Sequence, residues 1–322
     1  MIKICVISPS AGILQFFPKR VDNGYRWLLS QNIMVDFAPF ASDNDGYVSS
    51  SVSNRISDIE YALNSSDVIL ASIGGYNCNQ LLDKINYDLF YRNVSLCGYS
   101  DISALLLAVY SKTRRIVYHG PTFVPELCEY SEPFDYTWYY FEKIVLRHEL
   151  VQYHVPSYRV YEYSDWNDQE KKMVQRKKIS EDISWQVVRS GTAEGIFIGG
   201  NINTLIHIIG TEYCPLEVFE NALLFIEFTQ YNLAEFDSYI TGLRLRGVFN
   251  TIKGLIIGSF GNEGDTTKVA EMLKNNLKDY SFPIISDVDL GHTDPMITIP
   301  IGARGLLKAM EDGQIYFSVL GY

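Results

Sequence analysis

The sequence predicts an α/β protein, with an N-terminal parallel-sheet α/β domain and a second, smaller mixed α/β domain at the C-terminus. Buried apolar runs alternate with helical segments through the first half, which is the pattern of a parallel sheet covered by helices. The 322 residues are more than one hydrophobic core usually serves. A polar stretch separates two such halves, so we expect an N-terminal domain over 1–150, a connector over 151–180 and a C-terminal domain over 181–322.

The elements of the first half follow in order from this alternation. Strands are expected at the apolar runs Ile2–Ile7, Val68–Ser72, Ser95–Cys97 and Ile116–Tyr118. Helices are expected between them, at about Gly24–Ser30, about Ser53–Leu63 and Asp101–Lys112. Functional groups of such folds gather in loops at the carboxyl ends of parallel strands, so the loops after these runs are the first candidates for a site.

The second half repeats the alternation at a looser spacing. Strands are expected near Gly195–Ile198, Ala222–Phe228 and Ile252–Ile257. Helices are expected near Leu205–Ile209, Leu233–Leu243 and Thr266–Leu277.

The composition is typical of a soluble globular protein and excludes some partners. A net charge of -11 argues against nucleic acid or an anionic membrane as the main partner, because both attract basic patches. No run approaches the ~18 apolar residues that span a bilayer. The five cysteines are odd in number and none lies in a C-x-x-C pair, which indicates reduced thiols. The first residues are typical of a buried strand and not of a signal peptide, so we expect a cytoplasmic protein.

Ser100 stands where an apolar strand gives way to a helix. The strand stops at Gly98 and the helix begins at about Asp101, so Ser100 lies on a tight strand-to-helix turn. Such a turn presents a nucleophile well, because amides at the helix N-terminus point toward an oxyanion formed beside it. The alternative is that Ser100 only caps the helix, a role for which serine is favoured.

Glu227 is the one carboxylate in the apolar run Ala222–Phe228. Burying an unpaired charge is costly, so such a group is normally paired, hydrogen-bonded or at an exposed strand end. Two interpretations stay open here. Glu227 either faces water at the end of its strand, or orients an imidazole as the acid of a triad does.

His292 lies in a turn-rich loop after an apolar strand. A single loop histidine is often ordinary, and three neighbouring acids raise the alternative of a metal site, although no second histidine has ligand spacing. These acids are Asp287, Asp289 and Asp294. Of the other histidines, only His119 has the sequence context of a pocket residue. Serine, glutamate and histidine in this chain order can form a triad on an α/β scaffold.

Five blocks of the sequence occur in an order that is informative as a set. They are Ser72-Ile73-Gly74-Gly75-Tyr76-Asn77, Gly98-Tyr99-Ser100-Asp101-Ile102-Ser103-Ala104-Leu105, Gly199-Gly200-Asn201, Leu224-Phe225-Ile226-Glu227 and Gly291-His292-Thr293-Asp294-Pro295. In register, they resemble the signature blocks of the LD-carboxypeptidase family, which includes muramoyl-tetrapeptide carboxypeptidases and microcin C self-immunity peptidases. The resemblance spans nearly the whole chain.

The resemblance implies a role for each candidate residue. Ser100 is the nucleophile, His292 the general base and Glu227 the acid that orients it, at a junction between the two domains. The oxyanion donors are the backbone N–H of Asp101 and one from the Gly74-Gly75 turn, where glycine allows close backbone approach. The resemblance also implies a homodimer, and no metal or organic cofactor.

Two segments resemble the microcin-immunity branch more than the cell-wall recycling enzymes. The Gly-Gly turn continues Tyr76-Asn77-Cys78-Asn79, where the recycling enzymes usually have Gly-Gly-Tyr-Gly. Tyr163-Ser164-Asp165-Trp166 resembles an aromatic-bearing connector, in which Trp166 either stacks on a nucleobase or packs on the core. Phe228 departs from the family, in which an acidic residue often follows the triad glutamate, so contacts near the leaving group are expected to differ.

The sequence therefore predicts a serine carboxypeptidase or amidase that acts on a small peptide or peptidyl-nucleotide substrate. The candidate bonds are the L,D-peptide bond of a murein tetrapeptide and the aspartyl–nucleotide amide of a microcin-like toxin. The alternative from another functional class is a non-catalytic small-ligand binding protein on the same fold.

Overall fold

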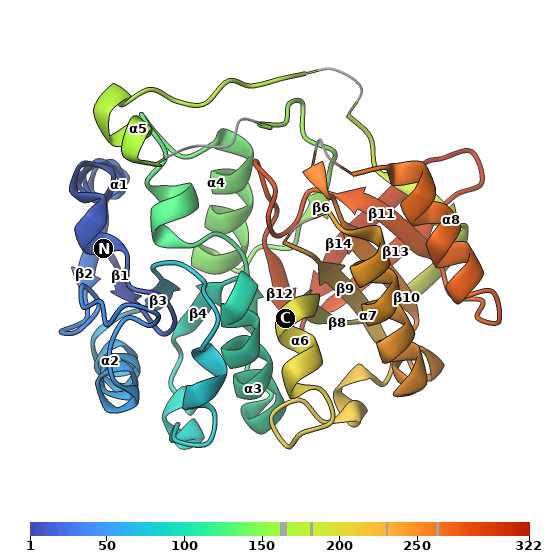
Figure 1. The fold of residues 1–322 in the computed structure, drawn as a ribbon, viewed down its shortest axis with the longest axis horizontal. Coiled ribbons are helices and arrows are strands. Elements are labelled where there is room, and N and C mark those ends of the chain that lie inside the picture. The colour runs from blue at the N-terminus through green and yellow to red at the C-terminus, as the bar shows by residue number, and fades with distance from the viewer. Residues whose placement is uncertain (162–165, 181–182, 230, 262–263) are drawn as a thin grey trace.

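The chain forms two β-sheets with helices packed on and between them (Figure 1). This computed structural model describes all residues except 162–165, 181–182, 230 and 262–263. Helix α3 (Ser103–Thr113) belongs to the first half and α6 (Ile202–Ile208) to the second, and the two pack against each other between the sheets. The predicted α/β class is confirmed.

The first sheet carries the N-terminal half of the chain. Its strands lie in the spatial order β12 (Ile299–Ile301), β5 (Val117–His119), β4 (Ser95–Gly98), β3 (Val68–Ala71), β1 (Ile2–Ile7) and β2 (Ile33–Phe37). All pairs are parallel except β12 with β5. The chain order reverses direction between β1 and β3, and sheets of this type place their functional loops at such a switch point.

The second sheet carries most of the C-terminal half. Its strands lie in the order β6 (Gln152–Tyr153), β14 (Ile315–Gly321), β13 (Arg304–Ala309), β8 (Gly191–Asn201), β9 (Ala222–Glu227), β10 (Gly254–Gly258), β11 (Ile284–Val288) and β7 (Gln186–Arg189). The central strands β8 to β11 are parallel and the flanking strands are antiparallel. β9 and β10 are buried along their whole length, as expected for strands covered on both faces.

Further α-helices of the described residues complete the layers. They are α1 (Pro18–Ser30), α2 (Val52–Ser65), α4 (Asp135–Phe141), α5 (Trp166–Lys172), α7 (Leu233–Leu245) and α8 (Thr266–Asn276). The sequence placed the start of α1 six residues too late, at Gly24, whereas the helix begins at Pro18 because proline is well suited to its first turn. α4 was not predicted, since its aromatic-rich sequence has low intrinsic helix propensity. None of the described helices is long and apolar enough to cross a membrane.

Two short strands cross the domain limits expected from the sequence. β6 lies in the segment expected to be a connector, yet it pairs with β14 of the second sheet. β12 comes from the C-terminal part of the chain and forms the edge of the first sheet, where Pro300 is tolerated. The expected domain limits at residues 150 and 180 therefore remain a prediction. Residues 299–301, although expected in the C-terminal domain, pair with the first sheet.

A buried ion cluster ties the connector to the second sheet. Arg159 is 5% exposed and donates from Nε to Asp289 at 2.6 Å and from Nη1 to Asp287 at 2.9 Å. Trp185 adds a hydrogen bond from its indole N–H to Asp289 at 2.9 Å. Both aspartates lie at the end of β11 or just beyond it, so this cluster fixes the loop that follows that strand.

We expect Asp289→Ala to lower the free energy of unfolding by about 3 to 5 kcal/mol, because it leaves Arg159 buried with only one carboxylate partner. Urea denaturation measures the loss. The control is Glu194→Ala, which removes an exposed partner of Arg304 and should cost less than about 1 kcal/mol. Equal losses in the two variants would contradict a structural role for the cluster.

Candidate active site

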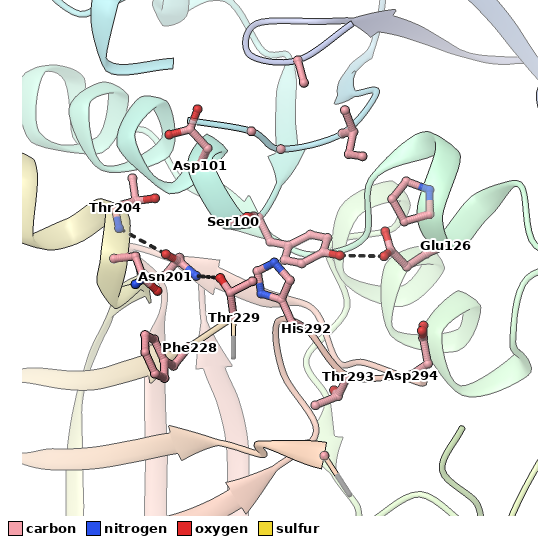
Figure 2. A pocket seen from close by; sticks show the side chains of 18 of the residues that line it. Ser100, Asp101, Glu126, Asn201, Thr204, Phe228, Thr229, His292, Thr293 and Asp294 are labelled. Carbon is pink, nitrogen blue, oxygen red and sulfur yellow. Dashed lines mark hydrogen bonds between the residues drawn. The ribbon is translucent and has the colours of Figure 1, made fainter. Parts of the chain in front are cut away.

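A cavity of about 1210 Å³ lies where loops from both sheets meet. Its lining includes Ser100, His292 and Trp166, together with Gly74 and Gly75. In Figure 2, Ser100 and His292 occupy the centre of the view, with Glu126 on one side and Thr204 on the other. The cavity thus brings together residues that lie almost two hundred positions apart in the sequence.

Ser100 lies on the predicted strand-to-helix turn. β4 ends at Gly98, and a short 3-10 helix, η4 (Ser100–Ile102), leads into α3. Ser100 has φ 60°, in the left-handed region that non-glycine residues seldom adopt. Its side chain caps neither η4, whose N-cap is Tyr99, nor α3, whose N-cap is Ile102. This geometry is that of a nucleophile presented on a sharp turn.

Gly74 allows the loop after β3 to lie directly against Ser100. A Cβ on Gly74 would stand 2.9 Å from the Ser100 Oγ and 2.8 Å from its Cβ, closer than side chains pack. The same Cβ position is 3.4 Å from the backbone nitrogen of Asp101. The Gly74-Gly75 turn and the start of η4 therefore border the same space beside the Ser100 hydroxyl.

The Asp101 carboxylate holds the surrounding loops together. It accepts hydrogen bonds from the Ser10 hydroxyl at 2.5 Å and from the Cys78 backbone N–H at 2.8 Å. Arg55, buried beneath these loops, donates to the carbonyls of Pro9 and Asn77. The loops after β1, β3 and β4 are thus fixed to one another, with Ser100 at their meeting point.

Glu227 and His292 form a buried pair. The Glu227 Oε2 lies 2.7 Å from the His292 Nδ1, and the Glu227 side chain is almost fully enclosed. Gly291, with φ 75°, passes so close to Glu227 that a Cβ there would lie 2.3 Å from the Glu227 Cγ. Glycine is therefore required for the loop after β11 to bring His292 onto the carboxylate. The strand-end Glu227 does not face water.

The two partners shift each other's pKa. Burial alone would raise the pKa of the Glu227 carboxyl, but the charge and hydrogen bond of His292 outweigh burial and hold that pKa below 4.5. Burial alone would lower the pKa of His292, but Glu227 raises it above 6.5, helped by the charges of Glu126 and Asp294. The protonated imidazole is therefore stabilised at this site.

The three aspartates near His292 are engaged by arginines. Asp287 and Asp289 bind Arg159, and Asp294 binds the Arg176 guanidinium at 2.7 Å. Across the described residues, no group of three or more histidine, cysteine, aspartate or glutamate side chains is arranged to hold a metal ion. These acids thus serve ion pairs in this structure.

His119 does not lie where the sequence placed it. It was expected to be a pocket residue, but its side chain has no exposed surface and it is absent from the cavity lining. It packs behind Tyr99 and against Phe225, with ring centroids 6.1 and 5.1 Å away. As the last residue of β5 it points into the core, and burial lowers its pKa to about 4. A direct contact between His119 and substrate is therefore not proposed.

Trp166 both lines the cavity and packs on neighbouring side chains, and its stacking on a nucleobase stays a prediction. It lines the cavity at the start of α5, and it also packs edge-on against Phe17 at 5.3 Å and beneath the Arg20 guanidinium at 5.6 Å. The preceding residues 163–165 lie outside the described part of the chain. Phe228 also lines the cavity, where it packs against Phe236.

Sequence reasoning assigned no role to two residues of the site. Asn201, part of the Gly-Gly-Asn block, donates from its side chain to Thr229 and helps to lower the pKa of Glu227. Glu126 lines the cavity wall at only 5% exposure. Its signal was available, because Glu126 is a lone carboxylate in the run Phe123–Leu127, just as Glu227 is in its own strand.

We expect Glu227→Gln to lower the pKa of His292 by about 1 unit or more, because the buried imidazolium loses its anionic partner. NMR titration of histidine-labelled protein, with His292→Gln to assign the signal, measures the pKa. The control is Glu235→Gln, which alters another cavity carboxylate bound to Tyr239 and should leave the His292 titration unchanged. The same pKa in Glu227→Gln and the unmodified protein would contradict the assigned pairing.

Family models and solved structures match the chain along its length. The model of the LD-carboxypeptidase N-terminal domain matches residues 4–120, and that of the LD-carboxypeptidase C-terminal domain matches 194–307. The microcin C7 self-immunity protein MccF of Escherichia coli is 31% identical over 88% of this chain and 84% of its own.

The fold agrees with these matches. The crystal structure of an MccF-like protein from Bacillus anthracis str. Ames has a TM-score of 0.89 at 29% identity and covers 99% of this chain and 97% of its own. MccF in complex with glutamyl sulfamoyl guanosine has a TM-score of 0.89 at 28% identity, with 99% and 96% covered. The chain therefore belongs to the LD-carboxypeptidase family and is a peptidase.

Proposed function

We propose that the chain is a serine carboxypeptidase or amidase that uses Ser100, His292 and Glu227 as its catalytic triad. The observation that carries this proposal is the arrangement of the three residues. A serine on a strained turn shares a cavity with a histidine whose Nδ1 is held by a buried carboxylate at 2.7 Å. Because Glu227 occupies Nδ1, the His292 Nε2 is the nitrogen left to accept the serine proton.

The reaction follows from these positions. His292 removes the proton from the Ser100 hydroxyl as its oxygen attacks an amide carbonyl, and the protonated imidazole is stabilised by Glu227. His292 then gives the proton to the leaving amine, so the amide C–N bond breaks and an acyl-enzyme remains. Water, deprotonated by His292, attacks the ester and releases the acid and the free serine.

The oxyanion of the tetrahedral intermediate needs fixed N–H donors. We assign this role to the backbone N–H of Asp101 and to one N–H of the Gly74-Gly75 turn, since both border the space beside the Ser100 hydroxyl. Each such donor contributes roughly 3 to 4 kcal/mol to transition-state stabilisation. The Asp101 carboxylate does not take part directly, because it is bound to Ser10 and Cys78.

The substrate we favour is a peptidyl-nucleotide conjugate, with a murein tetrapeptide as the other candidate. The cavity is large enough for either. Trp166 at its wall supplies an aromatic surface on which a base can stack. MccF has been solved with aspartyl sulfamoyl adenosine, and a mutant of MccF with adenosine monophosphate, which supports extending a nucleotide ligand to this chain.

We further propose that the enzyme works in the cytoplasm as a homodimer. All five cysteines are free and buried, which fits a reducing compartment. The homodimer rests on the resemblance to the family.

We expect Ser100→Ala to lower the hydrolysis rate by about 10⁴-fold or more, because it removes the nucleophile and leaves the cavity intact. The substrates are aspartyl sulfamoyl adenosine and a murein tetrapeptide, with products identified by mass spectrometry. Ser111→Ala, which changes a serine of α3 that lies outside the cavity lining, is the control and should retain full activity.

The outcomes separate the candidate functions. Release of the nucleotide part favours the immunity reaction, and loss of terminal D-Ala favours murein recycling. Ser100→Ala cleaving as fast as the unmodified enzyme would refute the triad. Tight binding of a substrate without cleavage would favour the binding-protein alternative.

We expect Trp166→Ala to raise KM for the nucleotide conjugate about 10-fold, through loss of stacking, with little change in kcat. Steady-state kinetics measure both constants. Trp166→Phe keeps an aromatic ring and should restore most of the affinity. A KM that rises equally for the tetrapeptide would show that Trp166 supports the cavity wall without recognising a base.

A further inference from the structure

Glu126 is a buried carboxylate in the cavity wall that the proposed mechanism does not use. It lies in η5 (Phe123–Leu127), the helical segment that follows β5, and is 5% exposed. Figure 2 shows it on the side of the cavity away from Asn201 and Thr204, with a dashed hydrogen bond reaching its carboxylate. Burying a carboxylate is costly unless its oxygens are hydrogen-bonded or paired, so the contacts of Glu126 indicate what it does.

Both oxygens of Glu126 are held in place. Oε1 accepts a hydrogen bond from the Tyr99 hydroxyl at 2.8 Å. Oε2 accepts from the Thr122 backbone N–H at 2.7 Å and from the Thr122 hydroxyl at 3.0 Å. Thr122 thus fixes the carboxylate, and the carboxylate fixes the Tyr99 hydroxyl.

Tyr99 connects Glu126 to the proposed catalytic residues. It directly precedes Ser100 in the chain, and its backbone carbonyl accepts the N–H of Ile102 at the start of the helix. Its ring packs edge-on against the imidazole of His292, with centroids 5.0 Å apart and an angle of 66° between the planes. The orientation of the Tyr99 ring therefore bears on both Ser100 and His292.

We propose that Glu126 is a positioning residue for the hydrolytic reaction, which acts through Tyr99 to fix the His292 ring and stabilises the protonated imidazole by its charge. This inference rests on the proposed function, because it assigns Glu126 a task within the same site. It adds Glu126 to Glu227 and Asp294 as a carboxylate that acts on His292.

The electrostatics of the wall support this assignment. Burial raises the pKa of Glu126 to about 7, the Asp294 charge adds to the rise, and the bonds from Thr122 and Tyr99 oppose it. Glu126 therefore gains its charge close to neutral pH. Below that pH it is protonated and contributes no charge to His292; above it, the anion favours the imidazolium.

Other groups face His292 and set the background. Glu227 and Asp294 are the remaining carboxylates that raise its pKa. His119 lies within electrostatic range, but burial keeps it uncharged near neutral pH. Arg176 forms an ion pair with Asp294 and thereby partly neutralises the charge of that carboxylate.

The test compares Glu126→Gln, Tyr99→Phe and the double variant. Glu126→Gln keeps the shape and can still bond Tyr99, whereas Tyr99→Phe keeps the ring and removes its hydroxyl. One readout is the pKa of His292 by NMR, measured without any substrate. The other is the rate at which an activated p-nitrophenyl ester acylates Ser100 with release of p-nitrophenol, followed across pH. Thermal unfolding of each variant reports on the fold.

Glu126→Gln should lower the His292 pKa by about 0.5 unit, because the imidazolium loses an anionic neighbour. Tyr99→Phe should slow acylation by about 5-fold or more, the effect of one lost hydrogen bond. The double variant should be no slower than the slower single variant, because both substitutions break one connection. The control Tyr87→Phe removes a hydroxyl that bonds the Leu82 carbonyl outside the cavity, and should leave both readouts unchanged.

An unchanged His292 pKa in Glu126→Gln, together with additive effects in the double variant, would overturn the inference. If Glu126→Gln does not fold, Tyr99→Phe alone decides, and an acylation rate equal to that of the unmodified protein would overturn it. If the unmodified protein is not acylated at all, the proposed function fails, whereas the NMR titration still decides whether Glu126 governs His292.

Discussion

The buried contact between Glu227 and His292 is the constraint around which both halves of the molecule are arranged. A carboxylate enclosed at the end of a central strand requires a partner, because an unpaired buried charge is costly. His292 supplies that partner from the loop after β11, and the loop reaches Glu227 only because Gly291 carries no side chain. That loop is in turn anchored by the Arg159 cluster at the end of the same strand. The second sheet thus positions an oriented imidazole. The proposed reaction also requires the first sheet to hold Ser100 close to this imidazole.

Contacts between the two halves of the chain hold the first sheet next to the second. The backbone N–H of Asn201, at the end of β8, donates to the Ser103 hydroxyl at the start of α3 at 3.0 Å, one turn beyond Ser100. β12 leaves the C-terminal part of the chain to pair with β5. The Tyr153 hydroxyl donates to the carbonyl of Thr298, just before β12, at 2.8 Å. These contacts set the two sheets at a fixed distance, so that Ser100 and His292 share one cavity.

Site residues could be predicted from the sequence where their local context is unusual. Features that depend on contacts between distant parts of the chain could not. A serine between a strand and a helix and a lone glutamate in an apolar strand are anomalies that a single sequence reveals. The structure places Ser100 in the cavity lining and buries Glu227 against His292. The crossing of β12 could not be predicted, because three apolar residues suit either sheet. His119 was misplaced since a Gly-Pro context marks a turn but not the direction of the side chain before it. Glu126 had the same signal as Glu227, yet its importance depends on Tyr99 and His292, which only the fold brings near.

The distribution of charge around the cavity explains how such a site reconciles stability with reactivity. The arginines of its wall are engaged by carboxylates, Arg159 by two aspartates and Arg176 by Glu129 and Asp294. They therefore hold the loops, and Arg176 offsets part of the charge of Asp294 near His292. Glu227 and Glu126 favour the imidazolium, which in the proposed mechanism would lower the barrier to removing a proton from Ser100. The same charge raises the pH at which the imidazole is free to act as a base, so their number is limited by the need for a neutral histidine near neutral pH. A carboxylate that ionises only near pH 7, as burial makes Glu126 do, adds its negative charge to the site only as the pH approaches neutrality.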